Sequence, residues 1–244
     1  TLYSHTIKQS LEVITFFDAK NSLANFCFNH PNYVFPEIVK DSSIINSQKL
    51  GHPLLNSKNR IDNDFEINKN SFLIVTGANM AGKSTFLRTI SLSIVMANIG
   101  LPVCANSFKY KPVKLITSMR TSDSLAENES YFYSELKRLK LIVETIQTDD
   151  YFIVLDEILK GTNSKDKASG SKKFVEKLVT LNTTGIIATH DVSLCELEND
   201  FKEIKNFFFD AKISNNELSF DYLFKKGVCE NRNASFLLKK MKII

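Results

Sequence analysis

A short glycine-rich segment carries the clearest chemistry in the sequence. Residues 77–84 read Gly-Ala-Asn-Met-Ala-Gly-Lys-Ser and fit the pattern G-x-x-x-x-G-K-[ST]. In such a loop, glycines let the backbone bend so that successive N–H groups face phosphate oxygens, and the following helix adds partial positive charge. The lysine, here Lys83, reaches the outer phosphates, and the hydroxyl of Ser84 binds Mg²⁺. We therefore predict a nucleotide-binding P-loop made by Gly77, Ala78, Asn79, Met80, Ala81, Gly82, Lys83, Ser84 and Thr85.

Two acidic residues follow a second apolar run. Residues 151–155 are Tyr-Phe-Ile-Val-Leu, and Asp156 and Glu157 come directly after them. A carboxylate at the end of a strand can hold the Mg²⁺ shell, so we expect Asp156 to share the metal with Ser84. Because the chain turns at the end of a strand, Glu157 can face the same site and orient the attacking water. The competing interpretation is a solvated acidic strand end.

His190 follows a third apolar run, residues 185–189. The carboxyl ends of parallel strands meet at one edge of a sheet, so this imidazole is predicted to lie near the γ-phosphate. A purely structural histidine is the alternative. Lys83, Glu157 and His190 are the catalytic candidates.

These three runs, with Phe72-Leu73-Ile74-Val75 as the first, alternate with helical patterns and so predict the fold. Apolar residues recur at helical spacing from Phe86 to Ile94, around 134–146 and around 168–181. Continuous apolar strands alternating with helices indicate an α/β fold, with a mostly parallel central sheet flanked by helices.

Residues 2–70, before the first of these strands, have a different pattern of apolar residues. Residues 2–28 have amphipathic helical spacing, and prolines at 31 and 36 end it. Short β-branched pieces and turn residues over 39–70 predict irregular strands. We expect a boundary near residue 40, with a short helical segment in residues 1–40 and the larger domain in 41–244.

The composition is that of an ordinary globular protein. Of 244 residues, 43% are hydrophobic and 24% are charged, which excludes disordered, collagen-like and disulfide-stapled classes. The net charge of +4 demands no anionic partner, and scattered basic pairs such as Lys172-Lys173 are predicted to be solvated faces. Four scattered cysteines without metal-ligand spacing indicate a reducing, cytoplasmic setting. We expect no membrane span, and the start at Thr1 within a helical pattern suggests a piece of a longer protein.

Several motifs together resemble the MutS family. Residues 76–88 are similar to its T-G-P-N-M-x-G-K-S-T-x-L-R, residues 155–166 to its D-E-x-x-x-G-T-S-x-x-D, and residues 188–190 to its A-T-H. Weaker matches follow in the same order along the chain, at residues 18–36, 51–53, 63–64 and 227–241. The resemblance covers nearly the whole chain and implies an ABC-like P-loop NTPase.

The resemblance also implies a dimer. In that family two subunits sandwich ATP, and a signature loop of one completes the site of the other; the matching stretch is 122–132. Ser130 would then donate to the γ-phosphate across a homodimer, and Asp166 would lie at the same dimer interface. Arg60 and Tyr222 fall near the positions that contact the adenine base. The alternatives are a helix N-cap for Ser130, a solvated loop acid for Asp166, a surface charge for Arg60 and a core aromatic for Tyr222.

Two departures from the family pattern stand out. Ala78 replaces the usual proline, which relaxes the loop without removing a donor. Glu127-Asn128-Glu129 replaces a small, often glycine-containing stretch, and two carboxylates there would weaken engagement across the dimer.

The predicted function is an ATPase that uses ATP and Mg²⁺ and couples nucleotide-dependent dimerisation to mismatched-DNA binding in DNA mismatch repair. DNA would be gripped by domains outside this chain. The alternative is a MutS-like paralogue acting as a nucleotide-switched binding module for branched DNA or ribosomes. An unrelated ABC transporter subunit is disfavoured because an L-S-G-G-Q type signature is absent.

Overall fold

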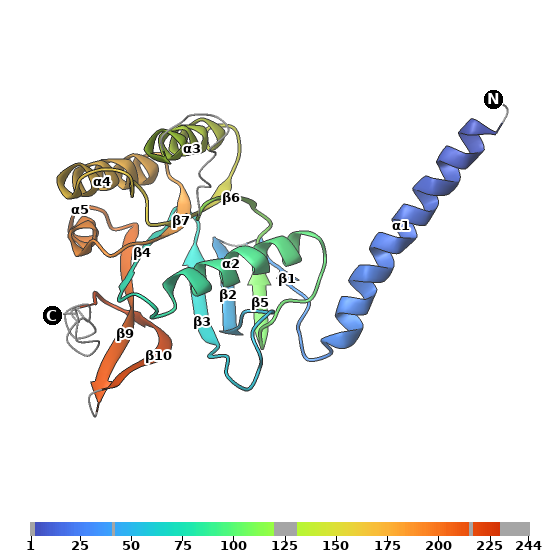
Figure 1. Cartoon of the computed structure of the whole chain (residues 1–244), viewed down its shortest axis with the longest axis horizontal. Helices are drawn as coiled ribbons and strands as arrows, with labels where there is room; N and C mark the ends of the chain where they lie inside the picture. The colour runs from blue at the N-terminus through green and yellow to red at the C-terminus, as the bar shows by residue number, and fades with distance from the viewer. Residues whose placement is uncertain (1–2, 41, 120–130, 215–216, 230–244) are drawn as a thin grey trace.

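The chain folds into two β-sheets with helices around the larger one (Figure 1). The computed structural model describes residues 3–40, 42–119, 131–214 and 217–229. Its α-helices are α1 (Ser4–Asn29), α2 (Lys83–Asn98), α3 (Tyr131–Thr145), α4 (Ser164–Thr180) and α5 (Leu197–Asp200), and a 3-10 helix η1 spans Val192–Glu196.

The larger sheet has six strands in the order β10-β9-β4-β8-β7-β6. They are β10 (Glu217–Lys226), β9 (Ile204–Ser214), β4 (Phe72–Gly77), β8 (Thr184–Ala188), β7 (Tyr151–Asp156) and β6 (Lys114–Ser118). Every neighbouring pair from β9 to β6 is parallel. The edge strand β10 pairs antiparallel with β9. The α/β class with a largely parallel sheet is thus confirmed.

Two strands of the smaller sheet lie within residues 39–70, for which irregular strands were predicted, and the other two lie outside that range. Its order is β1-β5-β2-β3, with β1 (Glu37–Ile38), β5 (Ser107–Tyr110), β2 (Ser43–Leu50) and β3 (Asn63–Asn68). The strands β2 and β3 form an antiparallel ladder whose register shifts twice. The pairing is therefore irregular, although β3 itself keeps a strict period-two burial pattern.

Two apolar clusters hold the layers together on opposite faces of the larger sheet. One joins α2 and the smaller sheet to residues such as Leu73 and Val75 of β4. The other joins α3 and α4 to Phe72 and Ile74 of the same strand. Side chains alternate along a strand, so a strand that is apolar at every position serves both faces.

Helix starts differ from the sequence prediction by three or four residues. Helix α4 begins at Ser164 and not near 168, because the Asn163 side chain accepts a hydrogen bond from the Asp166 N–H and caps it. Apolar periodicity begins only after such a polar first turn, so it locates a helix start late.

Helix α1 projects away from the body of the molecule (Figure 1). None of its residues is buried, although Leu23, Phe26 and Cys27 near its end pack against the core. The predicted boundary near residue 40 follows this helix and stays a prediction. In the part of the chain that the structure describes, no helix is both long enough and apolar enough to cross a membrane.

Candidate functional site

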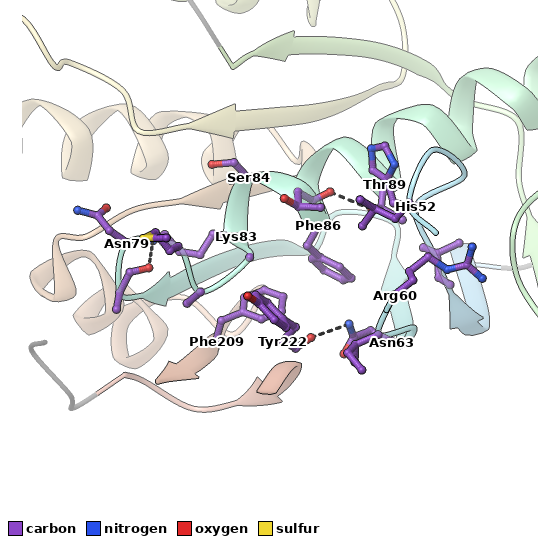
Figure 2. Close-up of a pocket in the computed structure, with 18 of the residues that line it drawn as sticks. His52, Arg60, Asn63, Asn79, Lys83, Ser84, Phe86, Thr89, Phe209 and Tyr222 are labelled. Carbon is purple, nitrogen blue, oxygen red and sulfur yellow. Dashed lines mark hydrogen bonds between the residues drawn. The ribbon is translucent and has the colours of Figure 1, made fainter. Parts of the chain in front are cut away.

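A pocket of about 460 Å³ lies at the carboxyl end of β4 (Figure 2). This volume falls within the range typical of small-molecule sites. Asn79 and Lys83 lie at one end of it, and His52 and Arg60 lie at the other (Figure 2). Among the predicted residues, its lining includes all of residues 78–85 together with Arg60, Glu157, His190 and Tyr222.

The glycine-rich loop has the backbone shape that its sequence predicts. Gly77 has φ +147° and Gly82, the N-cap of α2, has φ +103°. A Cβ on Gly77 would lie only 2.6 Å from the Phe209 carbonyl oxygen of the neighbouring strand. Met80 also has positive φ, at 67°, which is costly for a residue with a side chain. The loop is therefore held in a strained shape at the start of α2, where helix N–H groups point outward.

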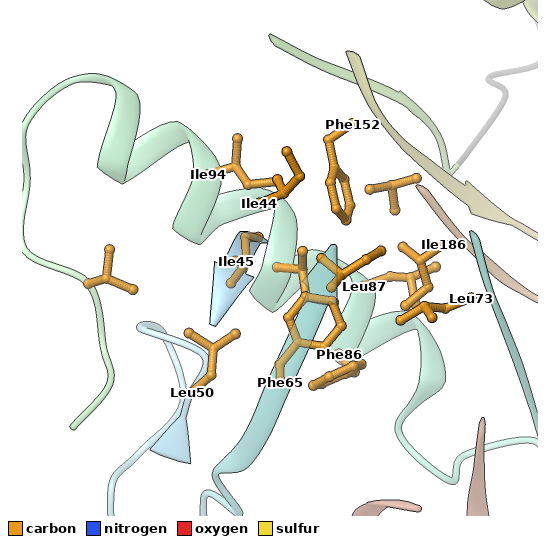
Figure 3. Close-up of a cluster of buried hydrophobic side chains, with 14 of the residues drawn as sticks. Ile44, Ile45, Leu50, Phe65, Leu73, Phe86, Leu87, Ile94, Phe152 and Ile186 are labelled. Carbon is orange, nitrogen blue, oxygen red and sulfur yellow. The ribbon is translucent and has the colours of Figure 1, made fainter. Parts of the chain in front are cut away.

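Helix α2 is anchored by the apolar cluster on the face of the larger sheet that the smaller sheet covers (Figure 3). Phe86, Leu87, Ile90 and Ile94 are buried at helical spacing along it. The Phe86 ring meets Phe65 of β3 edge-on, with the ring centres 5.6 Å apart. This packing fixes the loop at the front of the helix.

Lys83 is turned inward. Its residue is only 5% exposed, and Nζ donates hydrogen bonds to the carbonyl oxygens of Gly77 and Ala78 at 2.8 and 3.0 Å. Burial lowers the pKa of the Lys83 ammonium, and the nearby Glu157 and Asp156 carboxylates oppose that shift. The ammonium thus lies inside the loop that is predicted to wrap the phosphates.

Asp156 offers an oxygen without a partner. The residue is 7% exposed, and within the described ranges its Oδ1 has no hydrogen-bond partner. The orphaned buried carboxylate oxygen and the hydroxyl of the half-buried Ser84 are donor types that fit a cation held partly by substrate oxygens. No group of three His, Cys, Asp or Glu residues in the described chain could hold a metal alone. This donor set suits Mg²⁺ bound together with phosphates.

Glu157 turns into the pocket where β7 ends. Its φ of 54° reverses the backbone, and its N–H donates to the Ala188 carbonyl of β8 at 2.9 Å. Glu157 Oε1 lies 2.8 Å from His190 Nε2, and Oε2 lies 3.7 Å from Lys160 Nζ. The hydrogen bond from His190 is the main reason that the pKa of Glu157 falls to about 2. The side chain is therefore a carboxylate at any ordinary pH, which suits it to accept hydrogen bonds.

The three catalytic candidates form one connected cluster. His190 Nε2 lies 3.4 Å from Lys83 Nζ as well as 2.8 Å from Glu157. They come from the P-loop after β4, the end of β7 and the end of β8, which are adjacent strands. The sheet order thus brings together residues that lie more than 100 positions apart in the chain.

Arg60 lines the pocket, and its guanidinium is hydrogen-bonded to a carboxylate. Nε and Nη2 donate to the Asp62 carboxylate at 2.5 and 3.1 Å, and the side chain is 12% exposed. It extends away from Lys83 (Figure 2). A Cβ on Gly51 would overlap both side chains, at 2.3 Å from Asp62 Oδ1 and 2.4 Å from Arg60 Nε. Arg60 is therefore no solvated surface charge.

Tyr222 also lines the pocket and is 42% exposed, so it is no core aromatic. Its ring lies 3.1 Å from where a Cβ on Gly82 would stand, and its φ is 53°. Its backbone sits within the register shift between Phe220 and Phe224 of β10.

Asn63 is a pocket residue that was not among the predicted site residues. Its Nδ2 donates to the Tyr222 carbonyl at 3.0 Å, and its Oδ1 accepts from the Phe224 N–H at 2.7 Å (Figure 2). The side chain thus clamps β10 to β3 on both sides of Leu223. Its only signal in the sequence was the short Asn63-Asp64 match.

His52 is a second missed residue. Its half-buried ring lines the pocket, and Nδ1 accepts from the Leu54 N–H at 3.3 Å. Burial is the first cause that lowers its pKa, and Arg88 and Arg60 add to it, so the ring is neutral at pH 7. The Gly51-His52-Pro53 match was the available signal.

Two further predicted site residues, Asp166 and Ser130, are not among the described residues that line this pocket. Asp166 is exposed, lies outside this pocket and accepts from the Asn163 Nδ2 at 2.6 Å in the first turn of α4. Ser130 and the acidic stretch 127–129 lie outside the described residues.

Comparison with known proteins agrees with the motifs. The family model described as MutS domain V matches residues 73–241. The chain is 30% identical over 241 residues to MutS protein homolog 4 of Homo sapiens, covering 94% of this chain and 25% of that protein. It is 33% identical over 222 residues to DNA mismatch repair protein MutS of Finegoldia magna, covering 88% and 26%. The corresponding protein of Methanosarcina acetivorans is 34% identical over 229 residues, covering 89% and 25%.

The chain thus spans about a quarter of the length of these relatives. The matched region contains the P-loop, the acidic strand end and His190, which line or adjoin one pocket. The chain belongs to the MutS family and comprises its ATPase domain.

Proposed function

We propose that this chain binds ATP and hydrolyses it to ADP and phosphate with the help of Mg²⁺. The observation that carries the proposal is the cluster of Lys83, Glu157 and His190 at the ends of adjacent strands, beside a P-loop. P-loop N–H groups and the Lys83 ammonium would bind the phosphates. His190 would lie close to the γ-phosphate.

Ser84 and Asp156 are the residues that would hold Mg²⁺. The bound ion would neutralise charge on the phosphate oxygens. Glu157 would accept a hydrogen bond from the attacking water, and His190 would keep it ionised by donating to Oε1. Lys83 now bonds to loop carbonyls, so ATP binding would redirect its ammonium toward phosphate oxygens.

Arg60 and Tyr222 would contact the base. Two hydrogen bonds hold the Arg60 guanidinium on the Asp62 carboxylate, and the Tyr222 ring lies beside Gly82 at the edge of the phosphate loop. Guanidinium planes and tyrosine rings both stack on purines.

At the level of the whole protein, we propose a homodimer that sandwiches ATP, with Ser130 and Asp166 of one subunit completing the other's site. Nucleotide-dependent dimerisation would then act on mismatched DNA bound by domains outside this chain. The support is the family membership and the names of two of the relatives above. The alternative is a MutS-like paralogue acting as a nucleotide-switched binding module for branched DNA or ribosomes, and the acidic stretch 127–129 favours it.

An ATPase assay tests the chemistry. Lys83→Met and Glu157→Gln should each lower the rate by about 100-fold or more, because each removes transition-state stabilisation. Lys173→Met, which changes an exposed lysine on α4, serves as the control and should match wild type. Equal rates in all four proteins would refute the ATPase proposal.

Two binding experiments test the assembly. If Ser130→Ala leaves both turnover and ATP-induced dimerisation unchanged, Ser130 does not act across the dimer. Affinity of the protein at its full natural length for mismatched duplex, perfect duplex and junction DNA then separates repair from the paralogue role. Preference for the mismatch supports repair, and preference for the junction supports the alternative.

A further inference from the structure

The loop that carries Glu157 is held from outside the pocket by helix α3. We infer that Glu135 of α3 is a positioning residue for hydrolysis: its carboxylate fixes the 157–161 loop and thereby the catalytic Glu157. This inference rests on the proposed ATPase function. It adds a residue that touches neither the pocket nor, in our scheme, the nucleotide.

The first observation is a buried carboxylate aimed at a backbone donor. Glu135 is only 3% exposed, and its Oε2 accepts a hydrogen bond from the Lys160 N–H at 2.9 Å. Burying a carboxylate is expensive unless it is paired or hydrogen-bonded. A charged acceptor also makes a stronger hydrogen bond than a neutral one. The contact therefore holds Lys160 firmly.

The second observation is a close backbone approach next to that hydrogen bond. A Cβ on Gly161 would lie 2.7 Å from Phe132 Cβ, 3.1 Å from Phe132 Cα and 3.2 Å from Phe132 N. The first turn of α3 thus rests directly on residue 161, with no side chain between the two backbones. Glycine is the only residue that permits this contact without displacement.

The loop needs such support because its own conformation is unfavourable. Glu157 and Leu159 both have positive φ, at 54° and 57°. Each residue held in that region costs on the order of 1 kcal/mol, so the surrounding structure must impose the shape. At one end the Glu157 N–H bonds to Ala188, and at the other end the Lys160 N–H bonds to Glu135. Glu157 therefore sits between two fixed points.

Helix α3 is itself tied to the sheet. Arg138 donates to the Thr117 carbonyl of β6 from Nε at 3.0 Å and from Nη2 at 2.6 Å. The helix begins at Tyr131, next in the chain to Ser130. A displacement at the start of α3 would thus reach Glu157 through Glu135 and Lys160, which links the serine proposed to act across the dimer to the carboxylate of its own subunit.

Kinetics of variants at position 135 provide the test. Glu135→Ala should lower kcat about 10- to 100-fold, because a misplacement near 1 Å has effects of this size, while KM for ATP stays within about twofold. Glu135→Gln should recover most of kcat, since its amide oxygen still accepts from Lys160. Glu144→Ala, on the same helix but exposed and paired with Lys140, is the matched control. Gly161→Ala should reproduce the fall in kcat if Glu135→Ala fails to fold.

Hydrogen exchange at the Lys160 amide gives a readout that does not depend on activity. It should be slow in wild type and Glu135→Gln and at least about tenfold faster in Glu135→Ala, because a protecting hydrogen bond is lost. If wild type hydrolyses ATP no faster than Lys83→Met, the ATPase proposal is refuted. The exchange rate of the Lys160 amide would then still show whether Glu135 holds the loop. In an active wild type, unchanged kcat and exchange in Glu135→Ala overturn the inference. Equal loss in the alanine and glutamine variants, with KM rising and thermal stability falling, also overturns it by showing a merely structural role.

Discussion

The two ends of the pocket are built differently. The phosphate end, meaning residues 77–85 with Glu157 and His190, comes from the ends of adjacent parallel strands and one helix start. The base end, meaning residues 52–63 and Tyr222, comes from a loop before β3 and from the edge strand β10. Backbone geometry shapes the first, whereas side chains that reach over to distant backbone shape the second.

This difference teaches where change is tolerated. At the phosphate end, glycines in unusual conformations and close neighbours leave no room for a side chain at residue 77. At the base end, the arginine at position 60 bonds to Asp62 through two parallel hydrogen bonds. A base offers a flat face that several side chains can stack on, while phosphate oxygens need donors in a fixed arrangement.

The largest expected effect comes from Gly77→Ala. Its Cβ would meet the Phe209 carbonyl at 2.6 Å, so β4 and β9 must separate where the loop begins. ATP binding should weaken about 100-fold, because small displacements of phosphate donors are costly. Isothermal titration with ATP and Mg²⁺ measures this. Gly100→Ala is the control: its φ is 78°, but nothing lies within 4 Å of the new atom, so binding should not change.

Asn63→Ala should affect the base end next most strongly. It leaves the Tyr222 carbonyl and the Phe224 N–H without their partner, which frees the backbone that holds the Tyr222 ring. We expect KM for ATP to rise about tenfold while kcat changes less than about threefold, in line with about 1–2 kcal/mol for such hydrogen bonds. Steady-state ATPase assays separate the two constants. A fall in kcat with unchanged KM would contradict the division of the pocket into two ends.

Tyr222→Ala should have a smaller effect. Losing one ring face costs about 0.5–1.5 kcal/mol, so the Kd for ATP should rise about threefold to tenfold. Tyr222→Phe keeps the ring and should bind like wild type. Binding of a fluorescent adenine nucleotide measures both variants, and identical affinities for alanine and phenylalanine would remove Tyr222 from the base site.

The smallest expected effect concerns stability and pH at the phosphate end. Glu157 has a pKa of about 2 in the folded chain against a usual value of 4.5, so its ionised form stabilises the fold above pH 4.5. That contribution is lost as the pH falls through about 2. The difference in unfolding free energy between wild type and Glu157→Gln, on the order of 1 kcal/mol, should therefore shrink between pH 4.5 and 2. Urea unfolding at several pH values measures it, and a difference that grows on acidification would contradict the His190 pairing.

Much of the phosphate end could be predicted from the sequence because its parts are contiguous. Residues 77–84 lie in one stretch, and Asp156, Glu157 and His190 directly follow continuous apolar runs. The run of apolar residues identifies a buried parallel strand, and parallel strands place their carboxyl ends together. For β2 and β3 the sequence predicted only irregular strands over 39–70, because the pairing between them shifts register twice.

The base end and the support of the catalytic loop could not be found in this way. Asn63 bonds to Tyr222, 159 positions away, and Glu135 bonds to Lys160, 25 positions away. No sequence motif predicts either contact. Asp166, which the resemblance places at the dimer interface, lies in the first turn of α4, where its N–H donates to the Asn163 cap.

The sequence alone thus determined the family and the α/β class and predicted which polar residues lie at the strand ends, since local patterns of glycine, apolar and acidic residues encode them. Only the tertiary structure decided that Asn63 holds Tyr222 and that Glu135 holds the loop of Glu157. The physical reason is that a hydrogen bond between a side chain and a distant backbone group depends on how whole elements pack. A linear pattern of residue types carries no record of that packing.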